Sequence, residues 1–324
     1  IIVSLIVLKN FLNIISPCII ITKKWRNMKK NYQNTLLITI LSILLILYLL
    51  NPTLIIKSIL NYTDLFIKKL FPVSFIFYII SSLLIDYGLV EFLTNTLNLN
   101  GATSYVTIMS LISGFPSGAK YIKDLLDKDL LNEKEANYLI RYTHFPNPMF
   151  ILGSVSTIFV SKKIPVIILI SLILSNFIIA LFYKEKTSKI KIPQKREVKD
   201  FSTSLTKAIT SSIKILIVVY GISVFFFLIS VVINNYIKLT PLNFVLINGI
   251  FDLTKGVFST TLMQNDIIKA ALIISFISLG SLSIHMQVKS IINDSNIKYK
   301  NFLISRLEQM ILANIIFIIL NNLL

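Results

Sequence analysis

A chain of 324 residues that is 55% hydrophobic and only 15% charged is too apolar for an ordinary soluble domain. Its net charge of +17 comes from Lys and Arg clustered between hydrophobic runs, which is typical of membrane-protein loops and not of a nucleic-acid-binding surface. The single cysteine, Cys18, excludes a disulfide framework and a CxxC redox pair. We therefore expect an all-α, polytopic transmembrane bundle in the cell membrane, with the lipid bilayer as a partner and no nucleic acid.

The N-terminal stretch 1–27 is set apart, because the first methionine is Met28 and it is followed by Lys29, Lys30 and a hydrophobic run. We expect 1–27 to be either a gene-model extension or an extra N-terminal anchor. The rest divides into a first transmembrane half at 28–183, a basic linker at 184–200 and a second transmembrane half at 201–324. The excess of lysine predicts that the N-terminus from Met28 and the linker are both cytoplasmic.

The first half is predicted to contain four spans, one interfacial amphipathic helix and one interrupted hairpin. The spans are expected at 36–50, 71–90, 136–160 and 164–183. The segment 53–70 is expected to lie at the interface, because Lys57, Asp64, Lys68 and Lys69 interrupt its apolar residues at helical spacing. The hairpin at 105–126 is broken by Gly114, Pro116 and Gly118, and the span at 136–160 is broken at 144–148.

The second half follows a similar order. We expect an amphipathic segment at 201–212, a span at 213–233, and a short apolar run from 240 to 247 that breaks at 248–256. A span at 266–288 is interrupted at 280–287, and the last span is 302–324. The same interval of 29 positions separates Gly118 from Asn147 and Gly256 from His285. The order of parts and the loop charges predict two opposed re-entrant, broken-helix hairpins in an inverted-repeat-like arrangement.

Four motifs in this order resemble the sporulation integral membrane protein YlbJ family, in the wider group with the nucleoside-recognition, or gate, domain. The motifs are Ser113–Lys120, Phe145–Gly153, Gly249–Gly256 and Leu279–Val288. The resemblance implies a membrane protein of spore formation, with a gate domain similar to part of concentrative nucleoside transporters. Because Asp252 stands where glutamate is expected, and Ser281 where glycine is expected, a nucleoside specificity is not carried over.

Ionisable and glycine-rich positions at membrane depth supply the candidate site. Lys120 needs a partner or an aqueous cavity, unless it snorkels to the interface. Asp252 is the only acidic residue in an apolar stretch of the sequence. Its carboxylate could pair with Lys255 on the same helical turn or with Lys120. The glycine-rich break could expose backbone groups to a ligand or simply kink the helix. The candidate substrate- or ion-binding residues are Gly114, Pro116, Gly118, Lys120, Asn147, Asp252, Thr254, Gly256, His285 and Gln287.

Enzymatic motifs do not appear in the sequence. His144 and His285 are the only histidines, and neither has an acidic cluster, so no metal site and no cofactor are expected. Two hypotheses remain for a protein that is not an enzyme. The first is a transporter or permease-like protein that moves a small solute through a midplane site. The second is a non-transporting scaffold for spore envelope or cortex assembly, with a membrane-protein partner or a homo-oligomer.

Overall fold

The regular structure of the chain is helical. The computed structural model describes residues 30–97, 100–184 and 200–323, and within these ranges no strand occurs. The all-α prediction is therefore confirmed for the described residues. The expected extension at 1–27 and nearly all of the linker at 184–200 lie outside them.

Among the described residues, five helical stretches are long and apolar enough to cross a membrane. They confirm the apolar helices expected near 36–50, 164–183, 213–233, 266–288 and 302–324. The helices are α2 (Lys30–Leu50), α9 (Lys163–Phe182), α10 (Phe201–Tyr236), the pair α13 (Asp266–Leu279) and α14 (Leu282–Ile292), and α15 (Tyr299–Leu323).

A long helical rod replaces the interfacial helix and separate span expected between 53 and 90. It consists of α3 (Pro52–Leu65), the π-helical turn η1 (Phe66–Leu70) and α4 (Phe71–Asp86). Pro72 lies in the first turn of α4 and cannot donate a backbone hydrogen bond, and the wider π turn before it lets the helix continue. The rod ends at Asp86, before Gly88 with φ 89°, and not at Val90.

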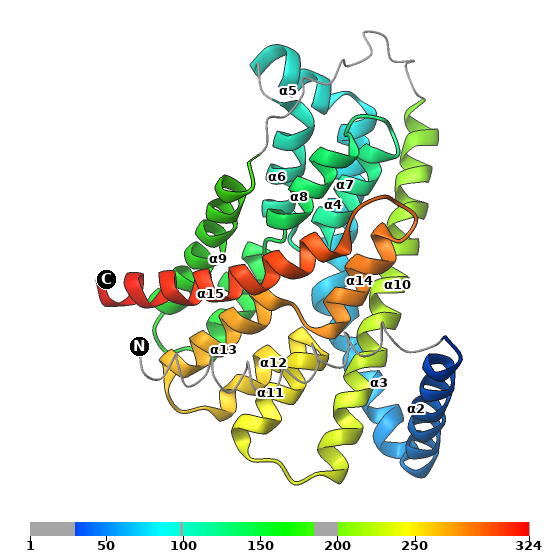
Figure 1. The fold of residues 1–324 in the computed structure, drawn as a ribbon, viewed down its shortest axis with the longest axis vertical. Helices are drawn as coiled ribbons and strands as arrows, with labels where there is room; N and C mark the ends of the chain where they lie inside the picture. Colours follow the sequence, from blue (N-terminus) through cyan, green and yellow to red (C-terminus); the bar gives the residue numbers. More distant parts are fainter. Residues whose placement is uncertain (1–29, 98–99, 185–199, 324) are drawn as a thin grey trace.

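Helix α10 also differs from the expectation, because 201–212 and 213–233 form one helix that continues to Tyr236. Asp200 caps its start by accepting a hydrogen bond from the backbone N–H of Thr203 at 2.9 Å. No proline or glycine occurs from Phe201 to Tyr220, so nothing in the sequence ends the helix at 212. Helix α10 packs along the α3–α4 rod, and both run most of the length of the molecule (Figure 1).

The remaining helices lie at the two ends of this frame (Figure 1). The upper part holds α5 (Leu89–Leu97), α6 (Gly101–Ser113), α7 (Ser117–Leu126) and α8 (Glu133–Tyr142), and the lower part holds α11 (Pro241–Phe251) and α12 (Leu253–Ser259). Short helical turns follow α8 and α12, namely η2 (Phe150–Ser154), η3 (Val155–Ile158) and η4 (Thr260–Leu262).

Every predicted break is a real interruption of a helix. Helices α6 and α7 are separated at 114–116, α11 and α12 at Asp252, and α13 and α14 at 280–281. The span expected at 136–160 is also interrupted, because α8 ends at Tyr142 and helical structure resumes only near Phe150. That segment is consequently not one of the long apolar helices.

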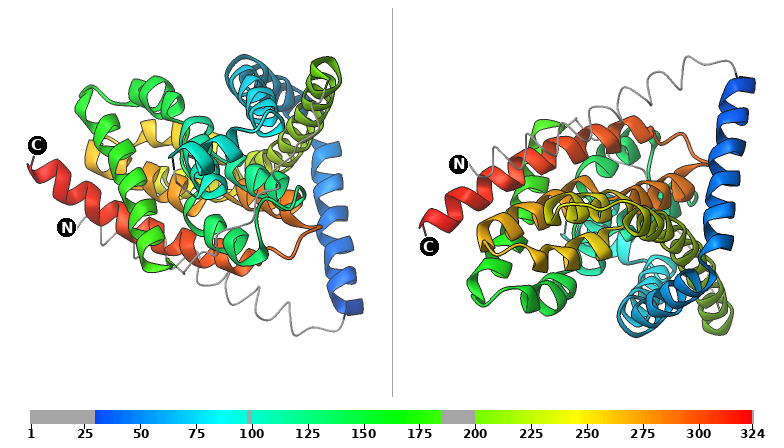
Figure 2. Two further views of the ribbon diagram at one scale, coloured as in Figure 1. Left: turned by 90° about the horizontal axis from the view of Figure 1, so that it is seen from above. Right: turned by 90° about the horizontal axis from the view of Figure 1, so that it is seen from below.

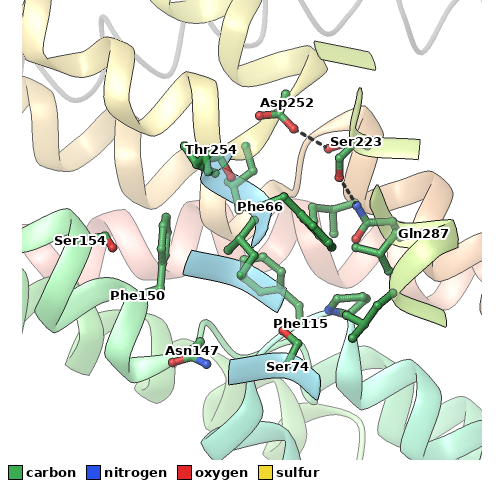
Figure 3. A pocket seen from close by; sticks show the side chains of 18 of the residues that line it. Phe66, Ser74, Phe115, Asn147, Phe150, Ser154, Ser223, Asp252, Thr254 and Gln287 are labelled. Atoms are coloured by element: carbon green, nitrogen blue, oxygen red, sulfur yellow. Dashed lines mark hydrogen bonds between the residues drawn. The ribbon is translucent and has the colours of Figure 1, made fainter. Parts of the chain in front are cut away.

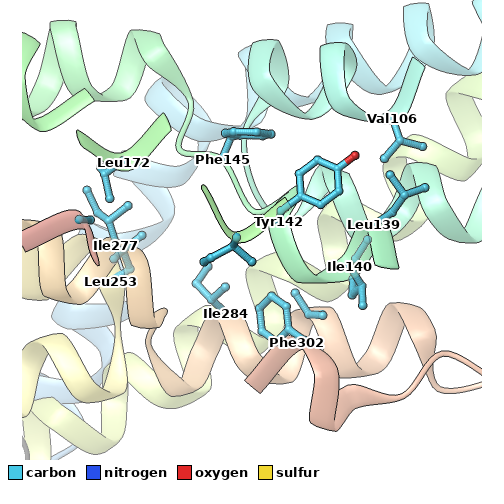
Figure 4. Packing of buried hydrophobic residues seen from close by; sticks show 14 of the residues in the cluster. Val106, Leu139, Ile140, Tyr142, Phe145, Leu172, Leu253, Ile277, Ile284 and Phe302 are labelled. Carbon is cyan, nitrogen blue, oxygen red and sulfur yellow. The ribbon is translucent and has the colours of Figure 1, made fainter. Parts of the chain in front are cut away.

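The main hydrophobic core joins residues from both halves of the chain. Figure 4 shows part of it, with Tyr142 and Phe145 of the first half near Ile284 and Phe302 of the second. Helix α15 crosses the molecule and packs most extensively against α9 and α13. Helix α2 stands at the edge of the bundle (Figure 2), and its side chains, such as Leu49 at 71% exposure, face outward as a bilayer-facing helix would.

Candidate functional site

The broken helices meet around one cavity of about 350 Å³. Each of the four breaks contributes to its lining (Figure 3). Pro116 comes from the α6–α7 break and Asn147 from the segment after α8. Asp252 comes from the α11–α12 break, and Ser283 from the first turn of α14. Segments separated by up to about half of the sequence are therefore brought to the same space.

One wall of the cavity comes from the α3–α4 rod, which contains none of the ten candidate residues predicted from the sequence. Its lining residues recur every four positions along one helical face, at Tyr62, Phe66, Leu70, Ser74 and Tyr78. This spacing is the signal that could have identified the wall from sequence. Helix α10 closes the next side with Leu216, Val219 and Ser223.

Asp252 combines a structural role with a place in the cavity wall. It is 2% exposed, and its Oδ1 accepts a hydrogen bond from the backbone N–H of Lys255 at 2.9 Å, which caps α12. Its Oδ2 accepts from the hydroxyl of Tyr62 at 3.0 Å and from Ser283 at 3.5 Å. Among the described residues that line the cavity, Asp252 alone carries a formal charge.

Gln287 presents an unused acceptor. Its side-chain amide donates to the hydroxyl of Ser223 at 2.8 Å, which ties α14 to α10. Its Oε1 is buried and has no hydrogen-bond partner among the described residues. A buried acceptor without a donor costs roughly 1–3 kcal/mol. Because Gln287 lines the cavity, a bound molecule with an N–H or O–H group could supply the missing bond.

The two breaks of the first half interlock beside the cavity. Gly114 has φ 78°, and a Cβ added there would lie 2.5 Å from the backbone nitrogen of Asn147. Asn147 donates its side-chain amide to the carbonyl of Ser113 at 3.2 Å, and the N–H of Phe115 donates to the carbonyl of Phe145 at 2.9 Å. Glycine is therefore required at 114 by both its backbone angle and its close neighbour.

Lys120 does not reach the cavity, and the proposed pairing with Asp252 is wrong. Its ammonium group lies 2.5 Å from Asp124, one helical turn away, although the lysine is only 1% exposed. The ammonium also lies over the rings of Tyr78 and Tyr121, at 5.6 and 5.8 Å from their centroids. A local i,i+4 carboxylate satisfies the buried cation, and Tyr78 lines the cavity whereas Lys120 does not.

His285 also lies outside the cavity lining. Its Nδ1 is 2.7 Å from the hydroxyl of Tyr299, and its Nε2 is 2.9 Å from the carbonyl oxygen of Leu279. The ring packs edge-on against Phe302. These contacts bridge the α13–α14 break and attach it to α15, so the position of His285 is structural.

Gly118 and Gly256 permit close packing and do not line the cavity. A Cβ at Gly118 would lie 2.5 Å from the carbonyl oxygen of Thr143, and one at Gly256 would lie 2.2 Å from the Cα of Gly249. The ten candidates therefore separate into two groups. Pro116, Asn147, Asp252, Thr254 and Gln287 line the cavity, whereas Gly114, Gly118, Lys120, Gly256 and His285 support the elements around it.

Substituting Gly256 by alanine should destabilise the α11–α12 pair, because the added methyl group would overlap the backbone of Gly249. We expect a loss of about 1–3 kcal/mol in the free energy of unfolding. Gly221 is the matched control, since a Cβ there meets nothing within 4 Å. Gly221→Ala should be neutral or gain up to about 1 kcal/mol through helix propensity. Unfolding of the two variants in mixed micelles measures the difference, and equal stabilities would contradict the packing role.

The part of the chain that the structure describes holds no group of three or more His, Cys, Asp or Glu that could bind a metal ion. The cavity lining is mostly apolar and aromatic, with hydroxyl and amide groups and one carboxylate at separate points of its wall. This composition is typical of sites for small organic molecules.

The comparisons with known proteins agree with the membrane assignment. The chain is 27% identical over 302 residues to the sporulation integral membrane protein YlbJ of Bacillus subtilis (strain 168), an alignment that covers 78% of this chain and 74% of that protein. The resemblance to the YlbJ family is thereby confirmed. Together with the long apolar helices, this relative supports an integral membrane protein. No protein-family model and no solved structure matches the chain.

Proposed function

We propose that this protein acts in spore formation as a permease-like membrane protein that moves a small solute through the cavity between its broken helices. The observation that carries the proposal is the convergence of four helix breaks on one cavity with a single carboxylate, Asp252. Broken helices at corresponding positions of two halves are typical of transporter binding sites. The link to spore formation comes from the name of the Bacillus relative.

The arrangement of the breaks supports an inverted repeat with two opposed re-entrant hairpins. In the first half, Asn147 donates a hydrogen bond to Ser113 at the end of α6. In the second half, Ser283 donates one to Asp252 at the end of α11. Each half thus joins its hairpin break to its later break at the cavity wall. We propose that the two hairpins enter from opposite sides, with the N-terminus from Met28 and the basic linker in the cytoplasm.

The chemistry of the cavity favours an uncharged or singly positive solute with hydrogen-bond donors. Asp252 and the free Oε1 of Gln287 are acceptors, and no cationic side chain lines the described wall. An anion would be repelled by Asp252 at short range in a medium of low dielectric constant. Aromatic rings form part of the apolar wall, which suits a solute with an apolar body or with a cationic group placed over a ring. They come from Tyr62, Phe66, Tyr78, Phe115, Phe150 and Phe258.

Filling the cavity should abolish transport without unfolding the protein. Ser154 lines the cavity, whereas Thr157 in the following helical turn is exposed. We expect Ser154→Trp to reproduce the metabolite profile of spores from a deletion strain, while Thr157→Trp should match the wild type. Both introduce the same indole into the same short segment, so they form a matched pair.

The same experiment separates transport from the scaffold alternative. A scaffold would tolerate the filled cavity, because its partner surface is elsewhere. If spores that carry Ser154→Trp contain wild-type levels of every solute that the deletion alters, at equal protein abundance, the transport proposal is wrong.

A further inference from the structure

A second cavity of about 530 Å³ adjoins the first and differs from it in chemistry. It lies between α3, α10 and the α11–α12 pair. Both cavities have hydroxyl and amide groups in their walls, but the central one carries the carboxylate of Asp252 and the second one the ammonium of Lys255. The other polar residues of the second cavity include Ser58, Asn61, Asn234 and Asn235. Polar groups of this kind suit a polar solute on its way to or from water.

The two cavities share part of their walls. Tyr62, Leu65, Thr254 and Phe258 line both of them, so these side chains form the partition. Tyr62 and Leu65 come from α3, whereas Thr254 and Phe258 come from α12. A separation of α3 from α12 would therefore join the two spaces.

Tyr62 is the residue of the partition with a specific hydrogen bond across it. Its hydroxyl donates to Oδ2 of Asp252 at 3.0 Å, and its ring packs against Phe227 of α10 at 4.9 Å between centroids. The side chain is 6% exposed. One hydrogen bond thus connects Tyr62 of the partition to the carboxylate of the central cavity.

Both cavities present the same kind of unused acceptor. In the second cavity, Asn234 donates to Oδ1 of Asn248 at 2.8 Å, and its own Oδ1 is buried without a partner among the described residues. In the central cavity, Oε1 of Gln287 is in the same state. A solute that donates hydrogen bonds could therefore bind Oδ1 of Asn234 in the second cavity and Oε1 of Gln287 in the central one.

We infer that the second cavity is a second solute compartment and that Tyr62 is the gate between it and the central cavity. This inference rests on the proposed function, because it places the two compartments on one solute route. A bound solute that takes over an oxygen of Asp252 releases the tyrosine hydroxyl. The ring of Tyr62 then swings away from α12, and the solute passes between the compartments.

Cysteine accessibility tests this gate without knowledge of the solute. In a chain with Cys18→Ser, Ser58→Cys reports on the second cavity and Ser74→Cys reports on the central one. The probe is a membrane-impermeant, positively charged thiol reagent, applied to sealed vesicles from the face that labels Ser58→Cys. We expect Tyr62→Phe to raise the labelling rate of Ser74→Cys from that face by about tenfold, since the loss of one hydrogen bond to a charged group shifts a two-state equilibrium by about that factor.

Two controls make the outcome decisive. The labelling rate of Ser58→Cys should not respond to Tyr62→Phe, because that site lies outside the partition. Tyr48→Phe, on a tyrosine that lines neither cavity, should change neither rate. If Ser74→Cys is labelled at the same rate with and without the Tyr62 hydroxyl, Tyr62 is not the gate. Labelling measures access and not transport, so a failure here is distinct from unaltered solute levels with Ser154→Trp.

Discussion

Replacing Arg306 by methionine is expected to lower the free energy of unfolding by about 2–4 kcal/mol, although the new side chain is similar in length and more apolar. Arg306 is fully buried at 0% exposure. It donates to the carbonyl of Arg141 at 2.5 Å, to Oδ1 of Asn176 at 3.3 Å, and to Oε1 of Gln309. These bonds join the end of α8, the middle of α9 and α15.

Two opposing effects decide the sign of this change. Methionine removes the cost of burying a cation, which favours the variant. It also leaves three acceptors buried without a donor, each at roughly 1–3 kcal/mol. The second effect is larger, because the side-chain amides of Asn176 and Gln309 are already held by the carbonyls of His144 and Leu172 and cannot easily turn to other partners.

Titration into denaturing detergent, with helicity as the signal, measures the loss. Arg306→Lys should be intermediate, since it keeps the charge but not the planar fork of donors. Lys207→Met is the control for charge alone, because Lys207 is exposed on α10. A variant Arg306→Met as stable as Lys207→Met would show that the arginine does not join the three helices.

The positions of the helix breaks could be predicted from the sequence because they depend on local chemistry. Gly114 and Gly280 end α6 and α13 with positive φ angles, which glycine adopts readily, and Pro116 lies in the α6–α7 break and cannot donate a backbone hydrogen bond. Asn147 and Asp252 are residue types that are common at helix ends. The local partner of Lys120 was equally available from sequence. Asp124 lies four residues later on the same helical face, and this spacing is a better guide to an ion pair than a distant acid.

The closed site could not be predicted in the same way, because its walls depend on packing between distant segments. Tyr62 belongs to a segment whose lysines indicate an interfacial helix, and Tyr78 belongs to the span predicted at 71–90. Only the contact of α3 and α4 with α10 turns this aromatic face inward. The equal interval that relates Asn147 to His285 also fails as a guide to position. Asn147 lines the cavity, but His285 packs against Tyr299 and Phe302.

The largest effect on function is expected from Asp252→Asn, which should reduce solute transport about 10- to 100-fold while the protein remains folded. Asparagine keeps an oxygen for the N–H of Lys255 and is as good a helix cap as aspartate. It removes the charge that, under the proposed function, binds a donor-rich solute, and a hydrogen bond to a charged group is worth about 1.5–3 kcal/mol. A loss of about 1.5–3 kcal/mol in binding free energy corresponds to roughly a 10- to 100-fold loss of affinity.

Companion variants of Asp252 separate its two roles. Asp252→Ala should also lose about 1 kcal/mol of stability, because the cap of α12 is removed. Asp252→Glu keeps the charge and should retain part of the activity. Asp266→Asn is the matched control. The carboxylate of Asp266 lies 2.8 Å from the ammonium of Lys269, and neither residue lines the cavity. The readout is the level of the solutes that the deletion alters, normalised to protein abundance. If Asp252→Asn behaves like Asp266→Asn, the carboxylate caps a helix and has no part in transport.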